Sequence, residues 1–205
     1  LTMLGIIIGV AAVIALVSIG NGVKQDIQNS ISSLGSNLLM VMPGAPRTPG
    51  VRPSAGSMKS LKVSDYEAIS KLDGVKAASP MTNGSYVVIY QNKNWTTSVS
   101  GVSYNYLDVN NWSMKSGRFL SEKNVQNRER VAVVGKTVVK NLFGDEDPVG
   151  AEIRVKNIPF RIIGVLNSKG SGAMGNDQDD MVIIPYTTAM ERVEGVDYLR
   201  MIYVV

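Results

Sequence analysis

Residues 1–23, LTMLGIIIGVAAVIALVSIGNGV, contain no charged side chain, and residues 1–19 are all apolar or small. At ~1.5 Å of rise per residue, residues 1–19 would form a helix of roughly 28 Å, close to the ~30 Å hydrocarbon core of a bilayer. A helix on the surface of a soluble domain keeps one polar face, whereas this segment is apolar all round. We therefore predict that residues 1–22 form a transmembrane helix that anchors a large extramembrane domain.

Two other interpretations of this segment remain open. A cleaved signal peptide has basic residues before a shorter apolar stretch, and here no Lys or Arg precedes the run. A buried core helix is usually shorter, about 10–14 residues. The chain begins with Leu rather than Met, so we expect the natural protein to extend upstream.

Two glycines in the apolar segment, Gly5 and Gly9, stand four residues apart. Residues with this spacing share one face of a helix, and small residues there let a second helix approach closely in lipid. We interpret the pair as a helix-packing site. Because glycine is common in membrane helices, the alternative is that the pair has no packing role.

The helical pattern continues beyond the apolar segment. Val23, Ile27, Ile31 and Leu34 recur at the spacing of one helix face, with polar residues between them, and Gly35 is suited to end a helix. We expect residues 23–36 to form a stiff helical stalk above the membrane.

The composition excludes several kinds of chemistry. The chain contains neither Cys nor His. Ser-His-Asp and Cys-His catalysis, disulfides, and zinc sites built from these side chains are therefore ruled out. The net charge of +4 comes from scattered basic residues, which gives no sign of a nucleic-acid-binding surface. We predict no catalytic residues and no metal ligands in this chain.

The remainder reads as an α+β domain, because short strands and helices alternate without a regular βαβ repeat. Residues 43–60 are rich in Pro and Gly, which predicts a mobile loop. Ser64 and Glu67 form a sequence capping box that predicts a helix to about Lys71. The predicted strands are 37–44, 75–78, 85–91, 95–102, 130–134, 151–156, 160–166, 181–185 and 198–205, and two further helices are predicted over 137–143 and 187–193. The turns are expected at 92–94 and 157–159.

Two motifs resemble phosphate-binding loops but lack their context. Gly135, Lys136 and Thr137 end like a P-loop, yet Arg130 stands where the first glycine of that motif belongs. The GxGxxG run at 170–175 is followed by no predicted helix to bind a pyrophosphate. The acidic residues at 177–180 lack the spacing of a calcium loop. We expect no cofactor in this chain.

Several stretches carry a resemblance to a known family. Residues 1–44 closely resemble the first membrane helix and stalk of MacB-type ABC permeases, the macrolide-exporter family. Further stretches are similar to the extracytoplasmic domain of that family: SGRFLSEKN at 116–124, RVAVVGKTVVKNLFG at 130–144, DPVGAEIRVKNIPFRIIGVL at 147–166 and MVIIPYTTA at 181–189. The resemblance covers nearly the whole chain, and residues 43–60 and 167–180 are its least family-like parts.

The resemblance implies a two-lobed extracytoplasmic domain inserted between two membrane helices. A porter-like lobe would combine residues 37–102 with the return segment 181–205, and a Sabre-like lobe would comprise residues 103–180. The implied partners are a second permease copy, a cytoplasmic ABC ATPase, a membrane-fusion adaptor and, in a Gram-negative cell, an outer-membrane channel. The implied location is the cytoplasmic (inner) membrane, with the bulk of the chain extracytoplasmic.

The function implied is mechanotransmission in an ABC exporter. ATP-driven closure of a cytoplasmic domain would move the stalks, and the stalks would drive the outer domains to expel substrate such as an antibiotic. ATP hydrolysis would belong to a domain or subunit outside this chain, with ATP and Mg²⁺ bound there, so the chain itself is predicted not to be an enzyme. The open alternatives are a lipoprotein-releasing ABC permease and a membrane-tethered binding or sensor module without transport.

Overall fold

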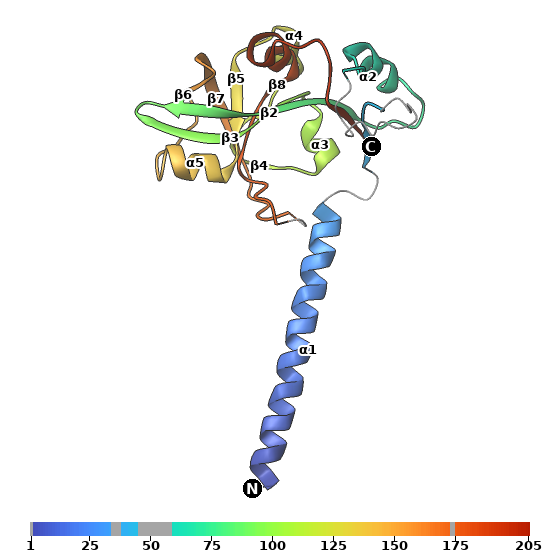
Figure 1. Ribbon diagram of the computed structural model, residues 1–205, viewed down its shortest axis with the longest axis vertical. Coiled ribbons are helices and arrows are strands. Elements are labelled where there is room, and N and C mark those ends of the chain that lie inside the picture. Colours follow the sequence, from blue (N-terminus) through green and yellow to red (C-terminus); the bar gives the residue numbers. More distant parts are fainter. Residues whose placement is uncertain (1, 34–37, 45–58, 173–174) are drawn as a thin grey trace, which may run out of the picture. The chain divides into compact units, whose positions relative to one another are not determined.

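The computed structural model describes residues 2–33, 38–44, 59–172 and 175–205, and within the first of these ranges it describes only some of the side chains. The chain divides into two units, Leu1–Ser36 and Asn37–Val205, which are considered separately below (Figure 1). Most of the predicted mobile loop, residues 45–58, lies outside the described residues.

The first unit contains one long helix, α1, which runs from Thr2 to Ser33 without a break. Large apolar side chains are exposed along it, including Val13, Ile14 and Leu16 at 60–70% of their full accessible area. No helix in the described part of the chain combines the length and the apolar character that are required to cross a membrane.

The second unit has mixed α and β structure, as the sequence predicts. Nine strands lie within its described residues: β1 (Leu39–Val41), β2 (Ala78–Tyr90), β3 (Lys93–Val102), β4 (Met114–Gly117), β5 (Val131–Val134), β6 (Glu152–Val155), β7 (Ile158–Leu166), β8 (Met181–Pro185) and β9 (Met201–Val204). The helices are α2 (Val63–Ile69), α3 (Tyr106–Asn110), α4 (Glu122–Gln126), α5 (Lys136–Leu142), α6 (Tyr186–Thr188) and a π-helix (Ala189–Glu194).

The strands form one hydrogen-bonded sheet with the order β1-β9-β2-β3-β8-β5-β7-β4. Strand β6 pairs with both β2 and β7, so the six strands β2, β3, β8, β5, β7 and β6 close into a ring. Strands β1 and β9 extend the sheet on one side of the ring, and β4 extends it on the other. Most neighbours are antiparallel, but β3 pairs with β8 and β5 pairs with β7 in parallel.

Two hydrophobic clusters lie on opposite faces of these strands, as the period-2 alternation of side chains requires. The inner cluster draws Val88, Val99, Val134, Ile153, Phe160 and Val182 from the six strands of the ring and Val138 and Leu142 from α5. The outer cluster contains Val131, Val133 and Ile183 from the same sheet, together with Tyr106 of α3. A third cluster, formed by Leu61, Tyr186, Leu199 and Ile202 among others, lies beside β9 and α2.

The two hairpins of the ring turn earlier than the sequence predicts. Tyr90 pairs with Lys93, so the β2–β3 turn is Gln91-Asn92, with Gln91 at φ 52°. The β6–β7 turn is Lys156-Asn157, and both residues have positive φ. Such a pair of left-handed residues makes a two-residue turn that matches the twist of the strands. Pro159 therefore lies within β7 rather than in the turn.

Other boundaries also differ from the prediction. Helix α2 begins at Val63 after Lys62, whose backbone N–H donates to Asp65 Oδ2 at 2.7 Å, so Ser64 does not cap it. Helices α3 and α4 and strand β4 were not predicted, because they are too short to show a clear period. One helix was predicted at 187–193, where the chain forms α6 and then a wider π-helix.

The predicted division into lobes crosses this sheet. Strands β2, β3 and β8 come from the segments assigned to the porter-like lobe, and β5, β6 and β7 come from the segment assigned to the Sabre-like lobe. These six strands share one ring and one hydrophobic cluster. The lobe boundaries therefore stay a prediction.

Candidate functional site

The predicted helix-packing residues both lie in α1. Gly5 and Gly9 are four residues apart, so they share one face of the helix. A Cβ atom added at Gly9 would meet nothing within 4 Å, whereas the surroundings of Gly5 lie outside the described side chains. Gly9 thus has room for a close neighbour, and the packing role of the pair stays a prediction.

The predicted stalk residues lie at the end of the same helix. Val23, Ile27 and Ile31 belong to α1, which places them on one face through their spacing of four. Their side chains lie outside the described set, and Leu34 lies outside the described residues altogether. The helix ends at Ser33.

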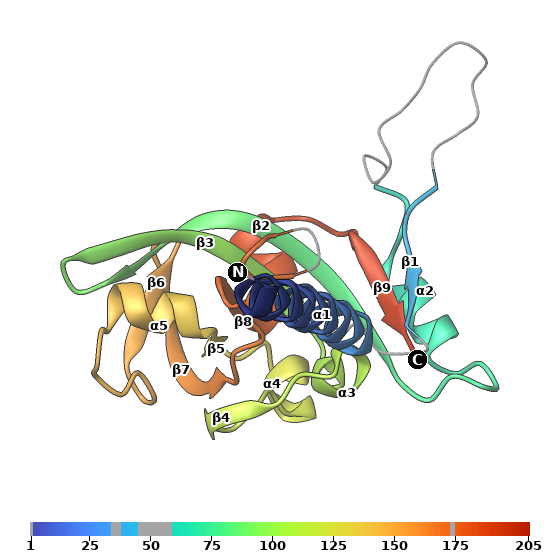
Figure 2. The same cartoon turned by 90° about the horizontal axis from the view of Figure 1, so that it is seen from below.

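The second unit offers a clearer site, the edge of the sheet where the chain enters and leaves. Strands β1 and β9 are antiparallel neighbours, and Leu39 at the start of β1 pairs with Val204 at the end of β9. Figure 2 shows β1 and β9 side by side. The two ends of the second unit therefore lie next to each other, and we call strands β1 and β9 the entry edge.

The entry edge is bound firmly to the rest of the sheet. Strand β9 pairs along its whole length with the start of β2, from Ala78 to Met81. The backbone N–H of Val205 donates to the carbonyl of Ala77 at 2.9 Å, and the N–H of Lys76 donates to the carbonyl of Val205 at 2.7 Å. Strand β9 is therefore hydrogen-bonded directly to β2, which belongs to the ring.

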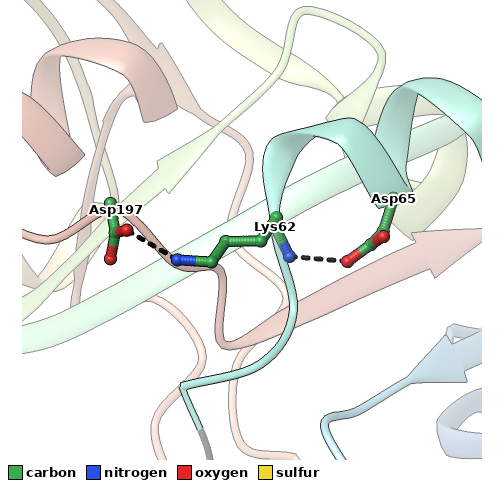
Figure 3. A network of polar contacts seen from close by, with 3 residues as sticks. All are labelled: Lys62, Asp65 and Asp197. Carbon is green, nitrogen blue, oxygen red and sulfur yellow. Dashed lines mark hydrogen bonds and ion pairs between the residues drawn. The ribbon is translucent and has the colours of Figure 1, made fainter.

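A short segment before α2 also holds the entry edge. The N–H of Leu199 donates to the carbonyl of Leu61 at 2.7 Å, and both side chains are buried in the same cluster. One residue further on, the ammonium of Lys62 lies 2.6 Å from Asp197 Oδ2 (Figure 3). The backbone of Lys62 donates to Asp65 at the start of α2, also drawn in Figure 3. Helix α2 is thereby attached to the segment that leads into β9.

The acidic run at 177–180 is occupied by contacts within the protein. The side chain of Asp179 is buried, and it accepts hydrogen bonds from Ser168 Oγ and from the backbone N–H of Lys169 and Gly170. Asp177 accepts from Thr137 Oγ1 at 2.6 Å. No cluster of three acidic, His or Cys side chains that could hold a metal ion occurs among the described residues.

In the P-loop-like segment, the backbone amides that would bind a phosphate in a P-loop donate hydrogen bonds within the protein. Gly135 precedes α5, and the N–H of Thr137 donates to the backbone carbonyl of Asp179 at 3.2 Å. A Cβ atom at Gly135 would overlap that same carbonyl, which explains why glycine suits the position. The glycine allows the acidic loop to approach the start of α5.

Burial raises the pKa of several tyrosines of the domain. It raises the pKa of Tyr186 to about 12, with smaller contributions from the neighbouring Tyr66 and Glu67. It raises the pKa of Tyr106 and Tyr203 as well, and the rings of these two lie 6.3 Å apart edge to face. These tyrosines stay protonated at neutral pH and serve as packing groups.

One polar pair was missed by sequence reasoning. The hydroxyl of the buried Thr82 in β2 donates to the carboxylate of Glu194 at the end of the π-helix. Burial raises the pKa of Glu194, against the opposing effects of Arg200 and Lys156. The two residues are more than a hundred positions apart in the sequence, and no local pattern connects them.

The sequence as a whole matches one family model. Residues 1–205 match the MacB-like periplasmic core domain. The chain belongs to this family. It is 46% identical over 201 residues to the "Macrolide export ATP-binding/permease protein MacB" of Rhodospirillum rubrum, and 41% identical over 204 residues to the protein of the same name from Marinobacter nauticus.

The alignments cover unequal shares of this chain and of its relatives. The alignments include 97% and 100% of this chain but only 30% and 31% of the two relatives. The chain thus corresponds to less than a third of each relative, both of which are named as combined ATP-binding and permease proteins.

Solved structures support the same assignment. The periplasmic region of MacB from Actinobacillus actinomycetemcomitans is similar with a TM-score of 0.72 and 28% identity, over 85% of this chain and 76% of that one. The extracellular domain of the ABC-type transporter YknZ from Gram-positive bacteria shares the fold, with a TM-score of 0.66, 18% identity, and coverage of 82% and 83%. The bulk of this chain is therefore the extracytoplasmic domain of a MacB-type membrane transporter.

Proposed function

We propose that this chain is the permease segment of an ABC exporter that transmits ATP-driven motion from the membrane to the extracytoplasmic domain. The names of the relatives, which combine ATP binding with a permease, support the transporter class. The motion would enter through α1 and reach the sheet at the entry edge. Expulsion of substrate would be the outcome, and the chain itself would carry no catalytic step.

The pairing of Leu39 with Val204 is the observation that best supports this proposal. It brings the two ends of the second unit to one edge of one sheet. A domain inserted between two membrane helices needs its ends at one place. Because β9 is also hydrogen-bonded to β2 along its length, a pull on either end would act on the ring rather than on a loose tail.

The apolar run of residues 1–22 supports a membrane span for the first part of α1. That stretch contains no charged side chain, and α1 continues past it to Ser33 as one helix. Residues 23–36 would then act as the stalk, and a continuous helix is stiff enough to carry a displacement. Gly5 and Gly9 would provide the contact with another membrane helix.

The remaining partners follow from the same proposal. A second copy would form a dimer, and a cytoplasmic ABC ATPase, fused or separate, would bind ATP and Mg²⁺. A membrane-fusion adaptor would receive the expelled substrate, together with an outer-membrane channel in a Gram-negative cell. The porter-like and Sabre-like lobes would move as the two working parts of the extracytoplasmic domain.

The proposal is tested by breaking α1 within the stalk of the full-length transporter. Proline at Gln28 removes one backbone hydrogen bond and clashes with the carbonyl one turn earlier, at a local cost of ~3 kcal/mol or more. We expect Gln28→Pro to retain basal ATPase activity and to lose export, measured by drug susceptibility or substrate release. The matched control is Gln28→Ala, which keeps the helix and should export normally.

Two results would count against the proposal. Export at the wild-type level in Gln28→Pro would mean that the stalk is a passive spacer. If the wild-type protein bound a substrate but did not export it, a membrane-tethered sensor would be favoured.

A further inference from the structure

A hollow of about 450 Å³ opens on the far side of the ring from the entry edge, beside the first half of β7. Its lining includes two arginines and one glutamate, Arg118, Arg161 and Glu129, together with the apolar residues Val131, Val149 and Ile163. Nothing in the transport proposal uses these residues.

A buried amide positions one of the two arginines. Arg118 Nη1 donates to Asn124 Oδ1 at 3.1 Å, and the side chain of Asn124 is only 3% exposed. Asn124 Nδ2 in turn donates to Glu129 Oε2 at 2.6 Å. The backbone of Arg118 is also fixed, because its N–H donates to the carbonyl of Ile163 in β7 at 2.9 Å. One guanidinium and one carboxylate are thus oriented before any ligand arrives.

The second arginine comes from the sheet itself. Arg161 lies in β7 opposite Val131 of β5, so its backbone is held by the ring. Neither Arg161 nor Arg118 forms an ion pair with another described residue. The hollow is therefore lined by two guanidinium groups and only one carboxylate, that of Glu129. This carboxylate already accepts a hydrogen bond from Asn124.

The rim leaves space for an approaching chain. Gly117 and Gly150 border the hollow, and both adopt positive φ, 72° and 95°. A side chain at Gly117 would overlap the backbone of β7, whereas a Cβ at Gly150 would point into open space. The absence of a side chain at Gly150 keeps the opening wide.

We propose that this hollow binds the C-terminal carboxylate of a short apolar peptide. A guanidinium donates two parallel hydrogen bonds to a carboxylate, which makes arginine the preferred side chain for this group. Val149, with the exposed edges of Val131 and Ile163, would contact the last side chains of the peptide, and Glu129 could accept from a peptide N–H. The site is independent of the proposed transport function.

The test uses the full chain in lipid nanodiscs, observed by ¹⁵N–¹H NMR. The probe is N-acetyl-trileucine with a free carboxylate, and its C-terminal amide is the matched control ligand. We expect saturable shifts of the Gly117, Gly150 and Ile163 amides with the acid, and at least 10-fold weaker binding of the amide. Because the two probes have the same apolar part, their difference removes any effect of partition into lipid.

Variants decide whether the arginine is responsible. Arg161→Gln should weaken binding of the acid about 10-fold, because it removes a charge-assisted hydrogen bond to the carboxylate. Arg154→Gln removes the same charge from an exposed position of the neighbouring strand β6, outside the hollow, and should bind like the wild type. Arg161 is exposed and takes part in no ion pair of the described residues, so the variant should fold.

Three results would overturn the proposal. The first is equal affinity for the acid and the amide. The second is equal weakening by Arg161→Gln and Arg154→Gln. The third is equally strong shifts with inorganic phosphate, which would show a general anion site rather than one for a peptide carboxylate.

Discussion

The ammonium of Lys62 lies 2.6 Å from Asp197 Oδ2 and joins the residue before α2 to the segment that leads into β9. The two side chains are 43% and 84% exposed, so water and salt screen the attraction between them. The backbone bond between Leu61 and Leu199, one and two residues away, is shielded by the surrounding cluster. The ion pair therefore marks where α2 meets the entry edge, while the buried neighbours stabilise that junction.

The first prediction concerns the titration of Asp197. The hydrogen bond from Lys62, and then its charge, hold the pKa of this carboxyl below its ordinary value. Lys62→Met should raise the pKa of Asp197 toward that ordinary value, as measured by NMR titration of the side-chain carboxyl. Lys71→Met removes a lysine that does not affect Asp197 and should leave the titration unchanged.

The same pair should have a weak effect on folding. A carboxyl with a lowered folded-state pKa stabilises the fold above its unfolded-state pKa, and this contribution is lost as the pH falls through the folded-state pKa. Because Asp197 is largely exposed, we expect no measurable difference in thermal midpoint between Lys62→Met and wild type at pH 7. A large loss of stability would mean that the ion pair, rather than the buried cluster, fixes α2.

The second prediction concerns Glu194, whose pKa is shifted in the opposite direction from that of Asp197. Burial raises the pKa of its carboxyl because the charged form is less well solvated, and Arg200 and Lys156 oppose this effect. An acid with a raised folded-state pKa lowers stability as the pH rises from its unfolded-state pKa through its folded-state pKa. Glu194→Gln keeps an oxygen that can accept from Thr82 and removes the charge.

We therefore expect Glu194→Gln to raise the thermal midpoint at pH 7 and to match the wild type near pH 4. Thermal unfolding of the full chain at both pH values measures the difference. Glu191→Gln is the control, because Glu191 forms an exposed ion pair with Arg128 and its removal should not stabilise the protein at pH 7. A lower midpoint for Glu194→Gln at pH 7 would show that the attraction of Arg200 and Lys156 outweighs burial.

How far the sequence predicts this fold is clear from particular elements. The segments of β5, β7 and β8 were placed within about two residues, because their apolar runs are bounded by Gly, Pro or charged residues. Helix α5 was also predicted, through the apolar spacing of Val138, Val139 and Leu142. These elements could be predicted because each depends mainly on the spacing of apolar residues within one short segment of the chain.

Apart from the short elements α3, β4 and α4, the features that were missed depend on distant contacts. The closure of the ring by β6 needs Val88 opposite Val155, and no local signal indicates that pairing. The pairing of Leu39 with Val204 likewise joins the two ends of the domain. The hollow with Arg118 and Arg161 could not be foreseen, because its residues come from β4, β5, β7 and the segments between strands, which are separated in the sequence. The predicted helix-packing and stalk residues are a different case, because their roles depend on contacts with other helices of the transporter.

The third prediction concerns Thr97, a buried residue of β3 that faces the inner cluster with Tyr86 as its partner in β2. Its side chain is 2% exposed, and its hydroxyl is without a hydrogen-bond partner among the described residues. A buried hydroxyl that is not hydrogen-bonded costs about 1–3 kcal/mol of desolvation. Valine has nearly the same shape and lacks this group.

We expect Thr97→Val to raise the free energy of unfolding by about 1 kcal/mol, measured by denaturant unfolding. Thr96→Val makes the same change at the next position, which is exposed on the other face of the strand, and should have little effect. A loss of stability in Thr97→Val alone would indicate that the hydroxyl is hydrogen-bonded in solution.

The last prediction tests the entry edge itself. The chain has no cysteine, so Leu39→Cys combined with Val204→Cys gives a single pair. Side chains directly opposite in an antiparallel pair have Cβ atoms about 4.5–5.5 Å apart, close enough for a disulfide after a small adjustment. We expect rapid oxidation of this pair. Leu39→Cys with Ile202→Cys places the cysteines diagonally, about 7–8 Å apart, and should react much more slowly.

The same pair separates two ways in which the domain could work. If α1 moves the entry edge as one piece, the two strands stay together, and the oxidised transporter should export as well as the reduced one. If β1 must leave β9 during the cycle, oxidation should abolish export and reduction should restore it. Unchanged ATPase activity in both states would show that any loss arises in the extracytoplasmic domain. We expect export to survive, because β9 is held by β1 on one side and by β2 on the other.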